Sequence, residues 1–243
     1  MIKKTIKILP GINEVSEFLI KEWKLYQKEA LNNKNYFTVA LSGGKTPKYF
    51  YKKLAEQKDK FKWEKTYIFM VDERYVSSIH IDNNYKMIKE NLFNKINIPE
   101  KNIFSINTQL SLNKSVIDYE NRIKNFFKHQ SLPSFDLVLL GIGNDGHTAS
   151  LFPKNKILKE TKKIVASVKN KNINHKRITL TYPIINNTKN IIFLVTGEKK
   201  AHIIKKIIEN KNKNYPASRI NPINGNLLFL LDEYASKELI YIS

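Results

Sequence analysis

The chain has 243 residues, 42% of them hydrophobic, which predicts one large domain over residues 1–243, with two smaller domains as the alternative. It has no cysteine and no run of about 18 apolar residues, so we expect no disulfide, no thiolate metal site, no membrane contact and a reducing compartment, the cytoplasm. Its formal charge of +20 comes mainly from lysines spread along the chain, so a general lysine bias explains it better than nucleic-acid binding, where arginine is the preferred base reader.

Apolar runs of strand length alternate along the chain with amphipathic helical patterns. The predicted strands are 36–41, 66–71, 136–141, 163–168, 190–196 and 227–231, and the predicted helices are 12–31, 47–57, 83–93, 115–129 and 198–210. Most of these strands are continuously apolar, which is typical of strands covered on both faces. The alternation therefore predicts a doubly wound, Rossmann-like α/β fold with a mostly parallel sheet and helices on both faces. Ligands of such folds bind at the carboxyl ends of the strands, where the motifs below occur.

The first motif is Ser42-Gly43-Gly44, which follows the strand 36–41 and precedes Thr46 and a helix. Two glycines let backbone N–H groups approach a ligand, and a helix N-terminus adds a positive dipole end, so the turn suits a phosphate. It matches neither a Walker A loop nor GxGxxG, which argues against a nucleotide. An ordinary strand-to-helix turn with Thr46 as N-cap is an equally good interpretation.

The second motif is Asp72-Glu73-Arg74, at the carboxyl end of the strand 66–71. Three charges at this place are paired with each other or face a cleft. The alternatives are a local ion-pair cluster and an arginine that carboxylates hold and aim at an oxyanion. Asn83 and Asn84 follow at the start of a predicted helix, as caps or as a contact to a polyol.

The third motif, residues 141–153, places Gly143, Asp145 and His147 in a glycine-rich loop after a buried strand. An imidazole can accept a proton near neutral pH, and a carboxylate two residues away can orient it. Ser150 lacks the GxSxG context of a nucleophile, so activation of water is the natural chemistry.

Two further cations are candidates for binding an anion. Arg177 begins a threonine-rich stretch, and Lys200 opens a helix after the strand 190–196. Arg177 carries more weight, because arginine is rare in this chain.

The other histidines, His80, His129, His175 and His202, show no metal-ligand spacing, and no HExxH motif occurs. We therefore expect no metal site and no catalytic role for them.

Taken in this order, the motifs resemble the 6-phosphogluconolactonase family, which shares a superfamily with glucosamine-6-phosphate deaminases. The resemblance extends over nearly the whole chain and is most specific at residues 141–153. Deaminases usually carry a tyrosine after the Asp-Glu pair and a glutamate shortly after the loop histidine. Here Arg74 takes the first place and no acid follows until Glu160, so deamination is the alternative.

The resemblance implies hydrolysis of 6-phospho-D-glucono-1,5-lactone to 6-phosphogluconate, the second step of the pentose phosphate pathway, with no metal or organic cofactor. It implies these roles: His147 as general base with Asp145, Asp72 and Arg74 at the reacting end; Ser42, Gly43, Gly44, Thr46, Arg177 and Lys200 on the phosphate; Asn84 and Gly143 as other contacts. Family members often have Ser-Asn where this chain has Asn83-Asn84, which leaves the role of Asn84 open. A monomer is expected, with a weak dimer as the alternative.

Two other classes of function remain as alternatives. One is a basic nucleic-acid-binding protein, which the scarcity of arginine disfavours. The other is a sugar-phosphate sensor without activity, which would require a missing catalytic residue, and none is missing.

Overall fold

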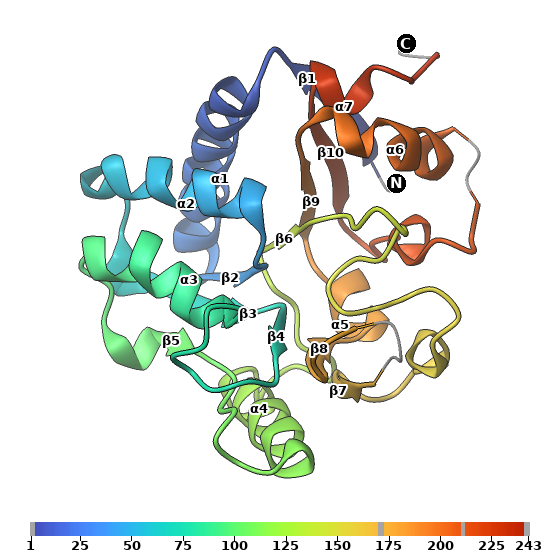
Figure 1. Cartoon of the computed structure of the whole chain (residues 1–243). Coiled ribbons are helices and arrows are strands. Elements are labelled where there is room, and N and C mark those ends of the chain that lie inside the picture. The colour runs from blue at the N-terminus through green and yellow to red at the C-terminus, as the bar shows by residue number, and fades with distance from the viewer. Residues whose placement is uncertain (1–2, 170–172, 210–211, 241–243) are drawn as a thin grey trace.

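The computed structural model describes residues 3–169, 173–209 and 212–240, and its centre is a seven-stranded parallel sheet (Figure 1). The strand order is β1-β10-β9-β6-β2-β3-β5. The strands of this sheet are β1 (Lys3–Leu9), β2 (Phe37–Leu41), β3 (Thr66–Met70), β5 (Ile103–Phe104), β6 (Leu137–Leu140), β9 (Asn190–Val195) and β10 (Asn226–Asp232). A second, antiparallel sheet has the order β4-β8-β7, with β4 (Asp72–Arg74), β7 (Val165–Val168) and β8 (Arg177–Leu180).

Helices cover both faces of the main sheet. The α-helices are α1 (Ile12–Lys34), α2 (Lys45–Glu56), α3 (Asn84–Asn91), α4 (Leu112–Phe126), α5 (Tyr182–Asn186), α6 (Ala201–Ile208) and α7 (Glu233–Ser236). Figure 1 shows α1, α2 and α3 on one side, and α4, α5 and α6 with the small sheet on the other. Short 3₁₀ helices are η1 (Lys58–Lys60), η2 (Trp63–Lys65), η3 (Phe93–Lys95), η4 (Glu100–Asn102), η5 (Lys156–Lys159), η6 (Glu198–Lys200) and η7 (Pro216–Arg219). Within the described residues, no helix is both long and apolar enough to span a bilayer.

The doubly wound α/β fold is confirmed, and every predicted strand except one lies in the main sheet. The exception, 163–168, is β7 of the antiparallel sheet. Helix α2 begins two residues earlier than predicted. The predicted helix 198–210 is η6 followed by α6, and its last predicted residue lies outside the described part of the chain. The strands β1, β4, β5 and β8 had no continuous apolar run to reveal them.

The core packs aromatic side chains against both faces of the sheet. On one face, Trp23 of α1 contacts Phe37 of β2 edge to face, with ring centroids 5.5 Å apart. On the other face, Phe69 of β3 stacks on Phe104 at 4.3 Å and meets Phe126 of α4. Every residue of β2, β6 and β9 is buried. Each fully buried large apolar side chain contributes about 1.5–3 kcal/mol, so these central strands are the firmest part of the scaffold.

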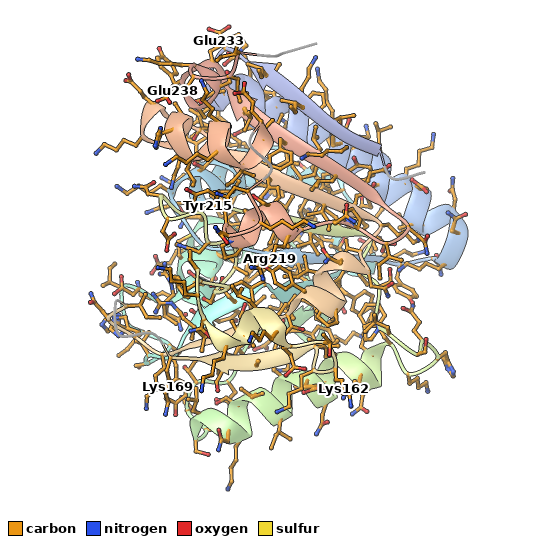
Figure 2. All side chains as sticks on the ribbon, turned by 90° about the vertical axis from the view of Figure 1, so that its right-hand side faces the viewer. Lys162, Lys169, Tyr215, Arg219, Glu233 and Glu238 are labelled. Atoms are coloured by element: carbon orange, nitrogen blue, oxygen red, sulfur yellow. The ribbon has the colours of Figure 1, made fainter. Side chains whose placement is uncertain are left out.

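This scaffold determines where the loops meet. The strands β9, β6 and β2 are neighbours and parallel, so the loops after them leave the same edge of the sheet. The small sheet is attached beside them through Val71, whose N–H donates to Leu41 at 2.9 Å and whose carbonyl accepts from Leu180 at 2.8 Å. Behind these loops, η7 supports the third motif, because Ala217 N–H donates to Gly146 at 3.0 Å. Figure 2 shows this supporting segment by its residues Tyr215 and Arg219.

Candidate active site

A cavity of about 810 Å³ opens at the carboxyl edge of the main sheet, between that edge and the small sheet. The loops after β2, β6 and β9 line it, together with residues of β4, β8 and α3. The structure brings nearly all of the predicted site residues to its wall: Ser42, Gly43, Gly44, Thr46, Asp72, Arg74, Asn84, Gly143, His147, Arg177 and Lys200. Asp145 alone is not part of the wall and contacts His147 from outside it.

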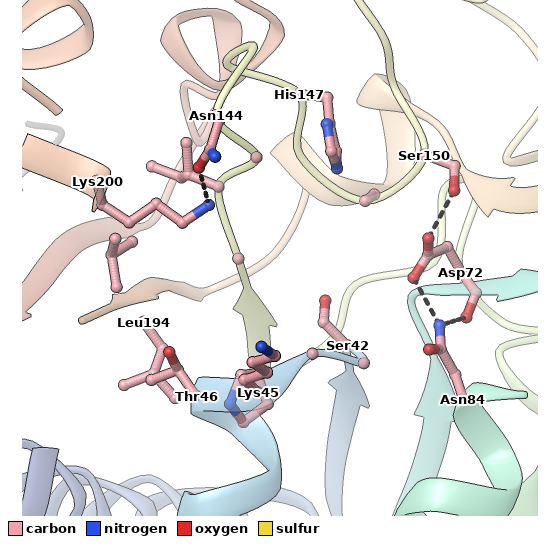
Figure 3. A pocket seen from close by; sticks show the side chains of 18 of the residues that line it. Ser42, Lys45, Thr46, Asp72, Asn84, Asn144, His147, Ser150, Leu194 and Lys200 are labelled. Atoms are coloured by element: carbon pink, nitrogen blue, oxygen red, sulfur yellow. Dashed lines mark hydrogen bonds between the residues drawn. The ribbon is translucent and has the colours of Figure 1, made fainter. Parts of the chain in front are cut away.

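His147 and Asp145 form a hydrogen-bonded pair. The distance between His147 Nδ1 and Asp145 Oδ1 is 2.5 Å, and the backbone N–H of His147 donates to the same oxygen at 3.1 Å. Partial burial raises the pKa of the Asp145 carboxyl, but the hydrogen bonds from His147 outweigh it and the net pKa is lowered. The carboxylate therefore stays ionised and accepts the Nδ1 proton. This leaves the lone pair of Nε2 for the cavity, where Figure 3 shows His147 opposite Ser42.

Gly143 makes room for the imidazole. A Cβ atom at this position would lie 2.1 Å from His147 Cε1 and 2.2 Å from Nδ1, which no side chain tolerates. The loop is held by its own backbone, because Gly143 N–H donates to the carbonyl of His147 at 2.8 Å. The glycine is thus needed for the position of the ring rather than for flexibility.

The turn after β2 presents backbone N–H groups to the cavity. Gly44, with φ of 120°, is the N-cap of α2, which begins at Lys45. Thr46 lies inside the first turn, so the interpretation of Thr46 as the N-cap is wrong. The hydroxyl of Ser42 donates to the carbonyl of Leu139 at 2.7 Å, so this residue shapes the turn with its side chain. The first N–H groups of a helix have no partner within it and favour an anion.

Asn84 connects this turn to the second motif. A Cβ atom on Gly43 would lie 1.9 Å from Asn84 Oδ1, so glycine is needed for this contact. Asn84 Nδ2 donates to the Asp72 carboxylate at 3.2 Å, and Ser150 Oγ donates to it at 2.6 Å (Figure 3). Asn83 is the N-cap of α3, as one of the two interpretations of this pair predicted.

Glu73 caps the start of α3 and does not hold Arg74 with its charge. It is fully buried and accepts the backbone N–H groups of Arg74, Asn84 and Tyr85 at 2.7–2.8 Å. Burial raises its pKa to about 7, although these three hydrogen bonds act in the opposite direction. Within the described residues no ion pair joins Arg74 to a carboxylate, so both the ion-pair cluster and the carboxylate-held arginine are wrong.

Backbone carbonyls orient the two arginines instead. Arg74 and Arg177 face each other across the β4–β8 pair. Arg74 Nη1 donates to the carbonyl of Asp82 at 2.7 Å, and Arg177 Nη1 donates to that of His175 at 3.2 Å. Burial and the nearby Arg74 lower the pKa of Arg177. The pair is a concentration of positive charge that no carboxylate neutralises at contact distance within the described chain.

Lys200 supplies a third cation from another direction. Its Nζ donates to Asn144 Oδ1 at 2.7 Å (Figure 3). Burial lowers its pKa, and the charge of Asp145 partly offsets that effect. A bound dianion would therefore find cations on two sides and the N-terminus of α2 on a third.

Some residues at the site escaped the sequence reasoning. Asn144 stands within the third motif and could have been noticed there. The local pattern around Ser150 bears only on a nucleophilic role, and the contact of Ser150 with Asp72, 78 residues earlier, leaves no trace in it. Thr196, whose hydroxyl lies 2.8 Å from that of Thr46, gave no signal at all.

Comparison with known proteins gives a consistent result. Residues 12–229 match the family model described as glucosamine-6-phosphate isomerases/6-phosphogluconolactonase. A 6-phosphogluconolactonase of Synechocystis sp. is 40% identical over 216 residues, covering 87% of this chain and 88% of that protein. One of Nostoc sp. is 37% identical, covering 98% and 99%. The solved structure of 6-phosphogluconolactonase from Trypanosoma brucei has a TM-score of 0.84 at 27% identity, covering 99% and 100%.

Proposed function

The chain belongs to the family of glucosamine-6-phosphate isomerases and 6-phosphogluconolactonases, and we propose that it hydrolyses 6-phospho-D-glucono-1,5-lactone to 6-phosphogluconate in the pentose phosphate pathway. One observation supports this most strongly. His147, three cations and the N-terminus of α2 line one cavity of about 810 Å³, a size suited to a phosphorylated sugar ring, and Asp145 contacts His147 from outside its wall.

In the proposed reaction, His147 Nε2 takes a proton from a water molecule, which attacks C1 of the lactone. The C1 carbonyl becomes a tetrahedral oxyanion, which Arg74 or the amides of the loop 141–153 stabilise. The bond from C1 to the ring oxygen then breaks, and the ring oxygen receives the proton from His147. A general base contributes about 10²–10⁴-fold and an oxyanion donor about 10²–10³-fold.

The phosphate anchors the other end of the substrate. Arg177, Lys200 and the first N–H groups of α2 are its proposed ligands, because all three line the cavity and no carboxylate of the described residues pairs with them. Binding energy from the phosphate orients the lactone toward His147.

The position of Glu160 favours the lactonase over the deaminase. It is the first acid after the loop histidine, and a deaminase would need such an acid at the reacting end. Glu160 instead lines a separate hollow of about 640 Å³ beside α4 and β7. The carboxylate that contacts His147 is that of Asp145, which can orient the imidazole as a general base.

The test is acid release from fresh 6-phosphogluconolactone at constant pH, measured above the spontaneous background. We expect fast release with the wild-type chain and a loss of at least about 10²-fold in kcat with His147→Ala. His129→Ala is the matched control, because His129 lies on the surface away from the cavity. Near-normal turnover by His147→Ala would refute the role of the base, and no release by the wild type would refute the function.

The proposal places a monomeric enzyme in the cytoplasm, without a nucleic-acid partner. The absence of cysteine supports a reducing compartment, and the scarcity of arginine argues against base recognition. Light scattering tests whether the protein is a monomer, and filter binding at two salt concentrations tests whether it binds nucleic acid.

A further inference from the structure

Two histidines that are far apart in the sequence meet beside the arginine pair. His175 Nε2 lies 3.1 Å from Asp82 Oδ2, and His80 Nδ1 lies 3.9 Å from the same oxygen. One ligand atom from each of the three residues lies within 4.8 Å of the others. The histidines show no metal-ligand spacing in the sequence, and the contact of His175 with Asp82 joins residues 93 positions apart.

The structure assigns a previously unrecognised metal site to these residues: we propose that His80, Asp82 and His175 bind one divalent transition-metal ion, best matched by Zn²⁺, outside the catalytic cavity. Two imidazoles and one carboxylate are a donor set that Zn²⁺ accepts, with a fourth position for water. Mg²⁺ and Ca²⁺ prefer oxygen ligands and fit this set poorly.

The spacing of the donors is close to what the ion requires. Two ligands bound tetrahedrally at 2.0–2.1 Å lie about 3.3 Å apart. The contact of 3.1 Å is close to this length, the distance of 3.9 Å must shorten by about half an ångström, and the three ligand atoms, which lie within 4.8 Å of one another, must close in on the ion. The side chains of His80, Asp82 and His175 are 41%, 50% and 27% exposed, so an ion can reach them from solvent.

The two imidazoles lie side by side without an ion, edge to face with ring centroids 5.3 Å apart. The backbone N–H of Asp82 donates to His80 Nδ1 at 3.0 Å. An ion bound at His80 Nδ1 therefore replaces this hydrogen bond, because the nitrogen has a single lone pair.

The site is joined to the active-site arginines through the backbone. The carbonyl of Asp82 accepts from Arg74, and the carbonyl of His175 accepts from Arg177. The proposed ion therefore bridges the two segments that aim these guanidinium groups. None of its three ligands lines the catalytic cavity, so its role is to fix the arginines and not to activate water.

The first experiment measures binding of Zn²⁺ alone to chelator-treated protein by calorimetry. It uses the His147→Gln background, which removes the Asp145–His147 pair as a competing site. We expect one ion per chain, and an affinity at least about 10-fold weaker after His80→Gln or His175→Gln is added. His202→Gln is the matched control, since His202 faces a single carboxylate at 3.3 Å, and it should change nothing.

Circular dichroism of each variant confirms that it is folded, and two independent histidine variants guard against the failure of one. Equal affinity with and without His175 overturns the proposal. So does a wild-type affinity that is lost entirely in the His147→Gln background, because the ion would then sit on the catalytic pair.

The second experiment tests the link to the arginines with the otherwise wild-type enzyme. Saturating Zn²⁺ should change KM for the phosphorylated lactone at least about 3-fold, and the change should be absent in His175→Gln. A KM that does not respond to bound Zn²⁺, or that responds equally in both proteins, overturns the link.

Discussion

Replacing Asp145 by asparagine tests whether the carboxylate assists the base. The substitution keeps the size of the side chain and removes its charge. In the reaction, His147 becomes a cation next to Asp145, with the two groups in contact at 2.5 Å. Asp145→Asn should therefore raise the barrier for proton removal from water while leaving the cations that bind phosphate in place.

The magnitude follows from the charge separation and the exposure. Unit charges about 4 Å apart interact by about 1 kcal/mol in water and about 4 kcal/mol near a protein surface of lower dielectric. The Asp145 side chain is 52% exposed, which favours the lower part of this range, about 1–2 kcal/mol. The expected loss in kcat/KM is then about 5- to 30-fold.

The assay is the profile of kcat/KM against pH, compared with that of Asp118→Asn. Asp118 is a half-exposed acid on α4 that faces Arg122 at 3.8 Å, and its variant should match the wild type. A folded Asp145→Asn enzyme with wild-type kcat/KM across the profile would refute this reasoning.

Four further predictions concern the anchor, the loop, the buried acid and the chemistry. Arg177→Ala should lower kcat/KM for the phosphorylated lactone at least about 10-fold more than kcat/KM for unphosphorylated gluconolactone. Arg74→Ala should lower kcat/KM for the two lactones by similar factors. Equal losses for the two lactones in Arg177→Ala would mean that Arg177 does not anchor the phosphate. Gly143→Ala should lower kcat by at least about 10-fold, because the added methyl group displaces the His147 ring. Gly141→Ala is the control and should lower kcat much less, because a Cβ at position 141 meets no atom within 4 Å. Similar losses in the two variants would contradict the steric argument. Because the pKa of Glu73 is raised from 4.5 to about 7, its contribution to stability is full below about pH 4.5 and is lost as the pH rises through about 7. Relative to Glu73→Gln, the wild type should lose up to about 3 kcal/mol of unfolding free energy, measured in urea, between pH 4.5 and 8. A gain of unfolding free energy over this range would contradict the sign. EDTA should leave kcat of the enzyme as purified unchanged, because the proposed ion at His80, Asp82 and His175 lies outside the cavity and affects only KM; a loss of kcat in EDTA would reveal a catalytic metal.

The main sheet could be predicted because its strands are buried on both faces. Residues 36–41 and 190–196 read as continuous apolar runs for this reason, and the structure places both at the centre of the sheet. The edge strand β1 alternates lysines with apolar residues, and the antiparallel strands β4 and β8 are three and four residues long and begin with charged residues. Such short, charged segments become strands only through their pairing partners, which local patterns do not show.

In the candidate site, contacts between residues close in the sequence could likewise be anticipated, and contacts between distant residues could not. The sequence left Asp145 and Asp72 open as the carboxylate that contacts His147, and the structure pairs His147 with Asp145, two residues away. The contacts of Ser150 with Asp72 and of His175 with Asp82 cross 78 and 93 residues and depend on how the small sheet is attached. The charges of Asp72, Glu73 and Arg74 suggested mutual pairing or an arginine held by carboxylates. Instead, Glu73 accepts backbone N–H groups of α3, Asp72 accepts from the side chains of Asn84 and Ser150, and Arg74 donates to the carbonyl of Asp82.

The way in which Arg74 and Arg177 are held has a consequence for how the enzyme handles charge. A carboxylate would orient a guanidinium and cancel its charge at the same time. A backbone carbonyl orients the guanidinium and leaves its charge intact. The groups that orient Arg74 and Arg177 in this protein therefore do not neutralise them. Among the described residues no carboxylate contacts either arginine, so a substrate phosphate pairs directly with an uncancelled charge, and the electrostatic gain of that contact comes at the moment of binding.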